Sequence, residues 1–221
     1  MQLNQIYQTL LKHYGPRHWW PADTPFEVVV GAILTQNTNW NNVEKAIANL
    51  RREQALSAPR ILQLPVPELE GLIRPSGYFR QKAARLQLFC RHLEQQHGGD
   101  LNAWLSGELQ QVRKELLSLK GIGPETADSI LLYAGQRLSF VVDAYTRRLF
   151  GRLGVLHGRE SYDAIRTRFM ESLEGDVKLY NEYHALIVIH AKETCRKTPL
   201  CPACPCRTGC RYGLDLLRQL G

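Results

Sequence analysis

The chain lacks the features that would place it in a membrane or in an export pathway. It has no apolar run of about 18 residues, which a transmembrane helix would need. Residues 1–5 contain no basic region followed by an apolar core, so we expect no signal peptide. In a reducing compartment, clustered cysteines bind metal more often than they form disulfides. We therefore expect a cytoplasmic protein whose cysteines are available to a metal.

Internal repeats, low-complexity segments and strand-like alternation are also missing. Alternation of apolar and polar residues extends no further than 139–142. Apolar residues instead recur at helical spacing. The sequence predicts an all-α protein, with two short helices within 58–73, a long helix ending at 97, and further helices over 3–14, 26–34, 43–52, 101–105, 108–117, 124–133, 144–153, 162–173 and 177–192.

Length and charge narrow the class of partner. The 221 residues are enough for one large or two small domains. Lys and Arg outnumber Asp and Glu by 28 to 21, which gives a formal net charge of +7. A modestly basic surface suits a polyanion, although ribosomal and peripheral proteins share it.

The most informative stretch runs from Leu119 to Asp143. Gly121-Ile122-Gly123-Pro124 stands between two expected helices. Two glycines one residue apart can adopt positive φ and let the backbone approach a partner closely, and proline suits a first helical turn. The prediction is helix, hairpin, helix, with amides beside a helix N-terminus that suit a phosphate. Asp143 ends an apolar run and is expected to cap the next helix.

Aromatic side chains stand in several expected loops. Trp19 and Trp20 lie between prolines, where a tryptophan pair either fills a core or serves a ligand. Residues 35–42 are amides and hydroxyls around one tryptophan, which suits contacts to nucleic-acid bases and backbone but also an ordinary helix connection. The turn 74–82 places an aromatic pair between basic residues, suited to wedging into a stack or to stapling a helix start.

Cysteines cluster near the C-terminus. Four of them follow the spacing C-x5-C-x2-C-x5-C, namely Cys195, Cys201, Cys204 and Cys210, and Cys90 and Cys206 are left over. Four cysteine ligands hold either Zn²⁺ or an iron–sulfur cluster. A single loop without two separated C-x2-C pairs disfavours a zinc ribbon.

These motifs together resemble the helix-hairpin-helix (HhH-GPD) DNA glycosylases of the endonuclease III type. The matching residues are L-x-G-I-G-P-x-T-A from Leu119 and V-D at 142–143. The resemblance implies that the hairpin grips a DNA phosphate and that Asp143 is the catalytic carboxylate. It also implies a [4Fe–4S] cluster on the four spaced cysteines, although the family spacing has one more residue in the first gap and Cys206 is a competing ligand.

The resemblance extends to domains and DNA contacts. It implies a helical barrel over 23–136 that ends in the hairpin, an iron–sulfur domain of 1–22 plus 137–221, and a DNA groove between them. Asn37 stands where the family inserts a side chain into the emptied base stack, and Tyr78 matches the opposing wedge. The residues expected to contact DNA are Asn37, Tyr78, Lys120, Gly121, Gly123, Arg196 and Lys197.

Glu125 departs from the lyase members of this family, which have a lysine nucleophile before Thr-Ala. A carboxylate cannot form a Schiff base with the sugar, and Lys120 lies elsewhere in the hairpin. The resemblance therefore implies a monofunctional glycosylase. Ionised Asp143 would stabilise an oxocarbenium-like transition state and orient or deprotonate the attacking water.

The expected base is an alkylated purine, because no general acid is evident and a purine alkylated on a ring nitrogen already carries positive charge. Aromatic faces attract such a cation by roughly 0.5–2 kcal/mol. Segments 18–21 and 34–38 resemble those of endonuclease III-like 3-methyladenine DNA glycosylases, in which an aromatic from each segment sandwiches the base. The implied pocket consists of Trp19, Trp20, Trp40 and Gln36.

Other readings remain open within and beyond the family. A uracil or thymine-mismatch glycosylase and an endonuclease III-like glycosylase/AP lyase are the nearest alternatives. A mismatched-adenine enzyme resembles the chain less, because residues 31–34 lack its glutamate. A non-catalytic DNA-binding iron–sulfur protein is the alternative of another class. A monomer on damaged double-stranded DNA, associated with a prokaryotic nucleoid, is expected.

Overall fold

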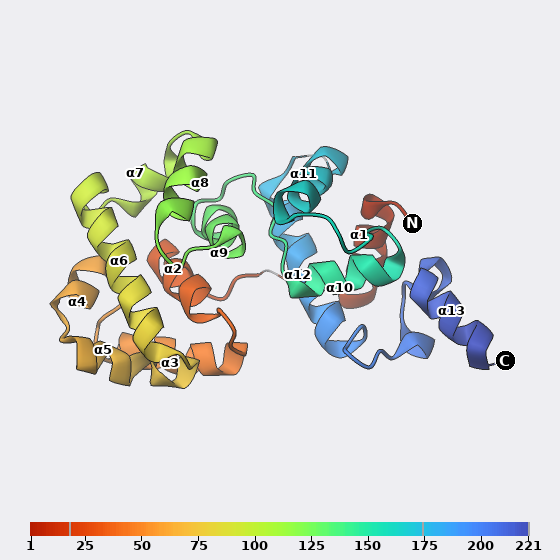
Figure 1. The fold of residues 1–221 in the computed structure, drawn as a ribbon, viewed down its shortest axis with the longest axis horizontal. Helices are drawn as coiled ribbons and strands as arrows, with labels where there is room; N and C mark the ends of the chain where they lie inside the picture. Colours follow the sequence, from red (N-terminus) through yellow and green to blue (C-terminus); the bar gives the residue numbers. More distant parts are fainter. Residues whose placement is uncertain (18, 174, 221) are drawn as a thin grey trace. The chain divides into compact units, whose positions relative to one another are not determined.

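The computed structural model describes residues 1–17, 19–173 and 175–220, with 217–220 as backbone only. Every regular element in these residues is helical, and they contain no strand (Figure 1). The all-α prediction is therefore confirmed. Among the described helices, none combines the length and apolar character needed to cross a membrane.

The chain divides into two compact units. One is continuous, Trp20–Arg137, and the other joins Met1–Trp19 to Leu138–Gly221. The sequence-based prediction sets the boundaries of the barrel domain at 23 and 136, and it stays a prediction. The iron–sulfur assignment of the second unit stays a prediction.

The continuous unit is built around α2 (Pro25–Leu34), whose residues from Glu27 to Leu34 are all buried. Its sequence offers almost no polar face, and a helix apolar on all sides is stable only when neighbours cover it. In Figure 1 it lies among the other helices of its unit, and several of them contact it. The elements in contact with α2 are α3 (Trp40–Arg52), α6 (Phe79–His97), α7 (Leu101–Ser106), α9 (Pro124–Ser129) and the π-helical turn η2 (Ile130–Ala134). The unit also contains α4 (Ala58–Gln63), α5 (Val66–Ile73), η1 (Arg74–Ser76) and α8 (Leu109–Ser118).

The second unit packs around α12 (Val177–Glu193), which contacts α1 (Leu3–Tyr14) and α10 (Ala144–Leu153). Buried aromatic rings fill its core, with the Phe140 and Phe169 rings stacked at 4.4 Å. Aromatic side chains bury large areas, so they contribute much of the stability of so small a core. The remaining elements are α11 (Tyr162–Ser172), η3 (Cys201–Ala203), η4 (Arg207–Gly209) and α13 (Arg211–Leu220).

The helix expected over 124–133 is α9 followed by the π-helical turn η2, and two further helices differ from the sequence prediction. α3 begins at Trp40 rather than at 43, because the Asn39 side chain accepts a hydrogen bond from the Asn42 amide at 3.0 Å and caps the helix there. Trp40 is therefore a helical residue and not part of a loop. α13 was not predicted.

Candidate functional site

The hairpin consists of residues 119–123, between α8 and α9. The Ile122 amide donates to the Leu119 carbonyl at 2.9 Å, which closes the turn. Gly121 has φ +92°, in the region that favours glycine. Gly123 has φ −90°, which any residue adopts, so the expectation of positive φ is wrong for Gly123. Lys120 and Gly123 are exposed at this turn.

Side chains from other elements hold the hairpin in place. The Gln36 amide donates to the Gly121 carbonyl and to Thr126 Oγ1, both at 2.9 Å, and its carbonyl accepts from Arg85. A Cβ at position 121 would overlap the Arg85 side chain. Gln36, predicted to line a base pocket, thus has both its amide and its carbonyl engaged in positioning the hairpin.

A buried ion pair joins the two helices of the motif. Arg113 on α8 binds Asp128 on α9 through two hydrogen bonds of 2.9 and 3.0 Å. Both side chains are buried. Breaking such a pair typically costs 3–5 kcal/mol, because the remaining charge stays buried. The pair therefore fixes the angle at which the hairpin is presented, and sequence spacing alone gave no sign of it.

The two side chains predicted to enter the DNA stack, Asn37 and Tyr78, both stand at positions with positive φ. Asn37 has φ +54° and Tyr78 has φ +45°, and both are exposed. Asparagine tolerates this region, whereas a bulky tyrosine there is unusual and marks a functional or structural constraint. Tyr78 is 65% exposed, which is high for a large aromatic ring.

Lys82 joins the end of α2, which precedes the Asn37 turn, to η1, which precedes Tyr78. Its Nζ donates to the Leu34 carbonyl and to the Ser76 carbonyl, both at 2.7 Å, and Thr38 Oγ1 also donates to Ser76. Lys82 is 1% exposed. Burial, and then the nearby Arg85 charge, lower its pKa to about 8. The sequence reads as a basic turn at this point, and only the packing shows that this lysine faces inward.

The tryptophans fall into both units. Trp20 and Trp40 are half-buried and meet edge to face, with centroids 5.0 Å apart and planes at 90°. Trp20 also contacts the Tyr133 ring at 5.0 Å and lies over Gly31, where a Cβ would come within 3.2 Å. A base sandwiched by Trp20 and Trp40 would require one ring to turn, since sandwiching rings are parallel. Trp19 belongs to the other unit.

Asp143 caps α10, as the sequence predicts. Its Oδ1 accepts hydrogen bonds from the Thr146 amide at 2.7 Å and from Thr146 Oγ1 at 2.9 Å. Its Oδ2 lies 3.5 Å from Nε2 of His184, on α12. Both Asp143 and His184 are buried. Capping occupies one oxygen and leaves the other facing the imidazole.

These contacts keep Asp143 ionised. Burial raises the pKa of its carboxyl, but the hydrogen bond and charge of His184 and the two Thr146 donors outweigh burial, so the pKa lies below its ordinary value. His184 was not among the predicted site residues. It lies in the mostly apolar segment of α12, where a histidine reads as a core residue, and only the fold brings it to Asp143.

The cysteine segment follows α12. The four spaced cysteines comprise three buried residues and the half-buried Cys204, and Cys206 is buried beside them. Arg152 holds the start of the segment by donating to the carbonyls of Arg196 at 2.6 Å and Lys197 at 2.9 Å. The side chains of Arg196 and Lys197 are exposed.

The donor set fits an iron–sulfur cluster. Arg152 Nη1 lies 3.3 Å from the Cys195 sulfur, and the Gly213 amide donates to the Cys210 sulfur at 3.5 Å. Iron–sulfur clusters use four thiolates whose sulfurs accept such hydrogen bonds, and burial protects them from solvent. The single-loop arrangement predicted from spacing is thus compatible with the structure.

The chain is similar in sequence to a family of DNA repair proteins. Residues 30–174 match the family described as "HhH-GPD superfamily base excision DNA repair protein". A protein of Methanocaldococcus jannaschii, provisionally named a DNA repair glycosylase, is 50% identical over 207 residues, which cover 93% of this chain and 94% of that protein. Endonuclease III of Thermotoga maritima is 29% identical over 215 residues, covering 95% and 92%.

One solved structure combines a similar fold with a bound base. It is the H. pylori 3-methyladenine DNA glycosylase bound to 1,N6-ethenoadenine, with a TM-score of 0.76 and 29% identity. The match covers 87% of this chain and 98% of that one.

Proposed function

Since the chain belongs to the HhH-GPD superfamily of base excision DNA repair proteins, we propose that it is a monofunctional DNA glycosylase for alkylated purines of the 3-methyladenine type. Because it belongs to this superfamily, the protein is a DNA glycosylase. The finer proposal concerns which base it releases and whether it also cleaves the sugar–phosphate backbone. A monomer suffices for this activity.

The observation that carries the proposal is the ionised carboxylate of Asp143. With its pKa held down, this group is a weak proton acceptor and a good fixed negative charge. Such a charge stabilises an oxocarbenium-like sugar as the glycosidic bond breaks, and it orients the water that attacks the anomeric carbon. The Thr146 hydrogen bonds fix Oδ1, so Oδ2 is the oxygen available for this role.

An alkylated purine suits a carboxylate that acts on the sugar without protonating the base. When its glycosidic bond breaks, the bonding electrons stay with the base and neutralise the charge on the ring, so no proton has to be delivered. A neutral purine would need protonation at that moment. The similarity to the H. pylori 3-methyladenine glycosylase favours the same choice.

The tryptophans supply faces for a cationic base. Trp20 and Trp40 are half-buried in one unit, and each carries an electron-rich ring that attracts a cation by roughly 0.5–2 kcal/mol. Because their rings now meet at 90°, we propose that the base enters as one ring turns. Trp19, the preceding residue, is the third tryptophan of the proposed pocket.

The DNA strand would be held by the hairpin and by the Asn37 and Tyr78 turns. The amides of Gly121 and Gly123 lie beside the start of α9, where a phosphate is favoured. Asn37 and Tyr78 would fill the space left by the extruded base, since both project from exposed turns. Lys120, Arg196 and Lys197 would add exposed positive charge along the backbone.

Glu125 and the environments of Lys82 and Lys120 support the absence of lyase activity. Position 125, in the first turn of α9, carries a carboxylate. Lys82 has a lowered pKa, but it is buried and donates to two main-chain carbonyls, so it is closed to a sugar. Lys120 is exposed within the hairpin itself. We propose that none of them forms a Schiff base.

The second unit would carry a [4Fe–4S] cluster on Cys195, Cys201, Cys204 and Cys210. When bound, such a cluster joins the four thiolates and fixes the loop that bears Arg196 and Lys197. Arg152 and Gly213 donate hydrogen bonds to two of the sulfurs, and these residues set the environment of the cluster.

The test is base release from methylated duplex DNA. We expect the protein to release free 3-methyladenine and the Asp143→Asn variant to release it at least about 100-fold more slowly, in line with losing a transition-state charge. Equal rates for the two proteins would contradict the role of Asp143. Thermal unfolding of the variant shows whether it stays folded.

A borohydride trap distinguishes this proposal from the second candidate, an endonuclease III-like glycosylase/lyase, which the Thermotoga maritima relative favours. Borohydride reduces a Schiff base to a stable protein–DNA adduct. We expect no adduct with wild-type protein. An adduct would establish lyase chemistry, and its loss in Lys120→Gln would identify the nucleophile.

A further inference from the structure

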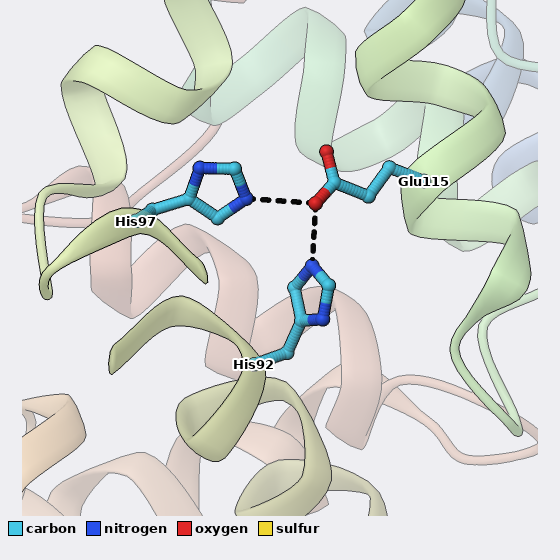
Figure 2. Close-up of side chains that lie close together, drawn as sticks. All are labelled: His92, His97 and Glu115. Carbon is cyan, nitrogen blue, oxygen red and sulfur yellow. Dashed lines mark hydrogen bonds and ion pairs between the residues drawn. The ribbon is translucent and has the colours of Figure 1, made fainter. Parts of the chain in front are cut away.

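A cluster of two histidines and a glutamate lies in the continuous unit, outside the residues assigned above. In Figure 2, the His92 and His97 rings point at one oxygen of Glu115. Glu115 Oε1 lies 2.7 Å from His92 Nε2 and 2.8 Å from His97 Nε2. His92 and His97 come from α6, and Glu115 comes from α8.

Trp104 fixes the orientation of all three side chains. Its Nε1 donates to the second oxygen of Glu115 at 3.0 Å. The His97 ring stacks on the Trp104 ring at 4.6 Å with planes 13° apart, and the His92 ring lies 5.2 Å from the same ring. Because Trp104 is buried, its ring is held in place and restricts the orientation of the two imidazoles that pack against it.

The local sequence explains how the two histidines converge. α6 ends at His97, and Gly98 and Gly99 follow with φ +57° and +82°, which turns the chain towards α7. Asp100 then caps α7 by accepting from the Ala103 amide at 2.9 Å. The sharp turn brings Trp104 under the end of α6.

The geometry suits a transition-metal ion. The three ligand atoms, two imidazole nitrogens and one carboxylate oxygen, all lie within 4.8 Å of one another. Zn²⁺ binds such atoms at about 2.0–2.2 Å, which in a tetrahedral site separates them by roughly 3.4 Å. The present separations of 2.7 and 2.8 Å would each have to increase by only about 0.6–0.7 Å.

The surroundings match those of known metal sites. Side-chain exposures of 18%, 21% and 23% leave room for a water in the remaining coordination position. The hydrogen bond from Trp104 supports the ligating carboxylate from outside, as outer partners do in such sites. Two nitrogen ligands favour Zn²⁺ over Mg²⁺ or Ca²⁺, which prefer oxygen.

We propose that His92, His97 and Glu115 bind a Zn²⁺ ion that joins the end of α6 to α8. α6 also carries Lys82 and Arg85, and α8 leads into the hairpin. The ion would therefore stabilise the framework that positions the hairpin. The alternative, a cluster held by hydrogen bonds alone, is an outcome of the test below.

The test is Zn²⁺ titration of the full-length protein by calorimetry and thermal unfolding. At an excess of about 100-fold over the dissociation constant, we expect the unfolding midpoint to rise by roughly 5–10 °C. His92→Gln and Glu115→Gln should lose one Zn²⁺ per chain and this rise. His157→Gln, an exposed histidine, is the matched control and should retain both.

Two results would overturn the proposal. One is wild-type protein that shows neither binding nor a midpoint shift, which would leave only the hydrogen-bonded cluster. The other is equal Zn²⁺ binding by wild type and both variants, which would place the ion at the cysteines or elsewhere. Glutamine at position 92 keeps an amide donor for Glu115, so this variant is expected to fold, and its midpoint without Zn²⁺ checks that it does.

Discussion

The carboxylate of Asp143 has two roles, because it caps α10 with one oxygen and faces His184 with the other. Oδ1 accepts both Thr146 donors and begins α10, while Oδ2 faces His184. Because the capping bonds fix the carboxylate, its orientation depends on helix formation rather than on a flexible side chain. His184 then adjusts the charge of the oxygen that would face the sugar.

The role of His184 can be tested through pH dependence. Removing it in His184→Gln takes away a hydrogen bond and a charge that lower the pKa of Asp143, so this pKa should rise. Activity needs the ionised form and is lost as pH falls through the pKa, so the acidic limb of the rate profile should move to higher pH. The rate at neutral pH should fall roughly 10-fold, or ~1.4 kcal/mol.

The control is His13→Gln, which alters an exposed histidine. It should leave both the rate and the acidic limb unchanged. If the acidic limb of His184→Gln coincides with that of the wild type while only the rate falls, His184 does not tune Asp143 and serves packing alone.

At the scale of the element, the two glycines of the hairpin have different tasks. Gly121 needs its positive φ and lies against Arg85, whereas Gly123 has an ordinary φ and nothing within 4 Å of where a Cβ would stand. Gly121 therefore serves the turn. Gly123 leaves an open approach to the amides beside α9.

The paired variants Gly121→Ala and Gly123→Ala separate these tasks. Gly121→Ala should lose at least about 1–2 kcal/mol of stability from the strained φ, seen as a lower unfolding midpoint. Gly123→Ala should stay within about 0.5 kcal/mol of wild type. Its DNA dissociation constant should nevertheless rise about 3- to 10-fold, as expected for losing one hydrogen bond to phosphate.

Equal midpoints for the two variants would refute the division of tasks. So would wild-type DNA affinity in Gly123→Ala, because the methyl group would then not stand in the path of the phosphate. Affinities should be compared at one salt concentration, since phosphate contacts weaken steeply with salt.

At the scale of the whole molecule, Arg148 and Arg152 of α10 hold the cysteine segment against the rest of the second unit. Arg148 donates to the Ala191 and Cys195 carbonyls at 2.8 and 3.0 Å. Arg152 also donates to the Cys195 carbonyl, and to the carbonyls of Arg196 and Lys197. α10 begins at Asp143, so the same helix carries the carboxylate at one end and holds the cysteine segment at the other.

Two serine variants test which cysteines hold the cluster. Cys204→Ser should abolish the visible absorbance of the purified protein and lower its iron and sulfide content. Cys206→Ser, which changes the neighbouring cysteine outside the four-residue spacing, should retain both. The reverse pattern would assign Cys206 as a ligand, and colourless wild-type protein containing Zn²⁺ would exclude an iron–sulfur cluster.

The sequence predicted the helices well because their apolar residues repeat at helical spacing, and it predicted the cap at Asp143 because capping is local. It did not give the pairs Arg113–Asp128 and Asp143–His184, since these depend on how separate helices pack. Residues 211–220 carry an amphipathic pattern, but it begins directly after Cys210, where the irregular cysteine segment gives no local signal for a helix start. The positive φ of Tyr78 has no signal in residue type.

Lys82 donates to the Leu34 carbonyl at the end of α2 and to the Ser76 carbonyl in η1, so it anchors the residues that lead into the Asn37 turn and into the Tyr78 turn. Because Lys82 holds both segments, neither the Asn37 turn nor the Tyr78 turn can be re-engineered independently. A designer who lengthens the Asn37 turn to accept a bulkier lesion would also disturb the Tyr78 turn, so altered specificity would have to be selected in both turns together.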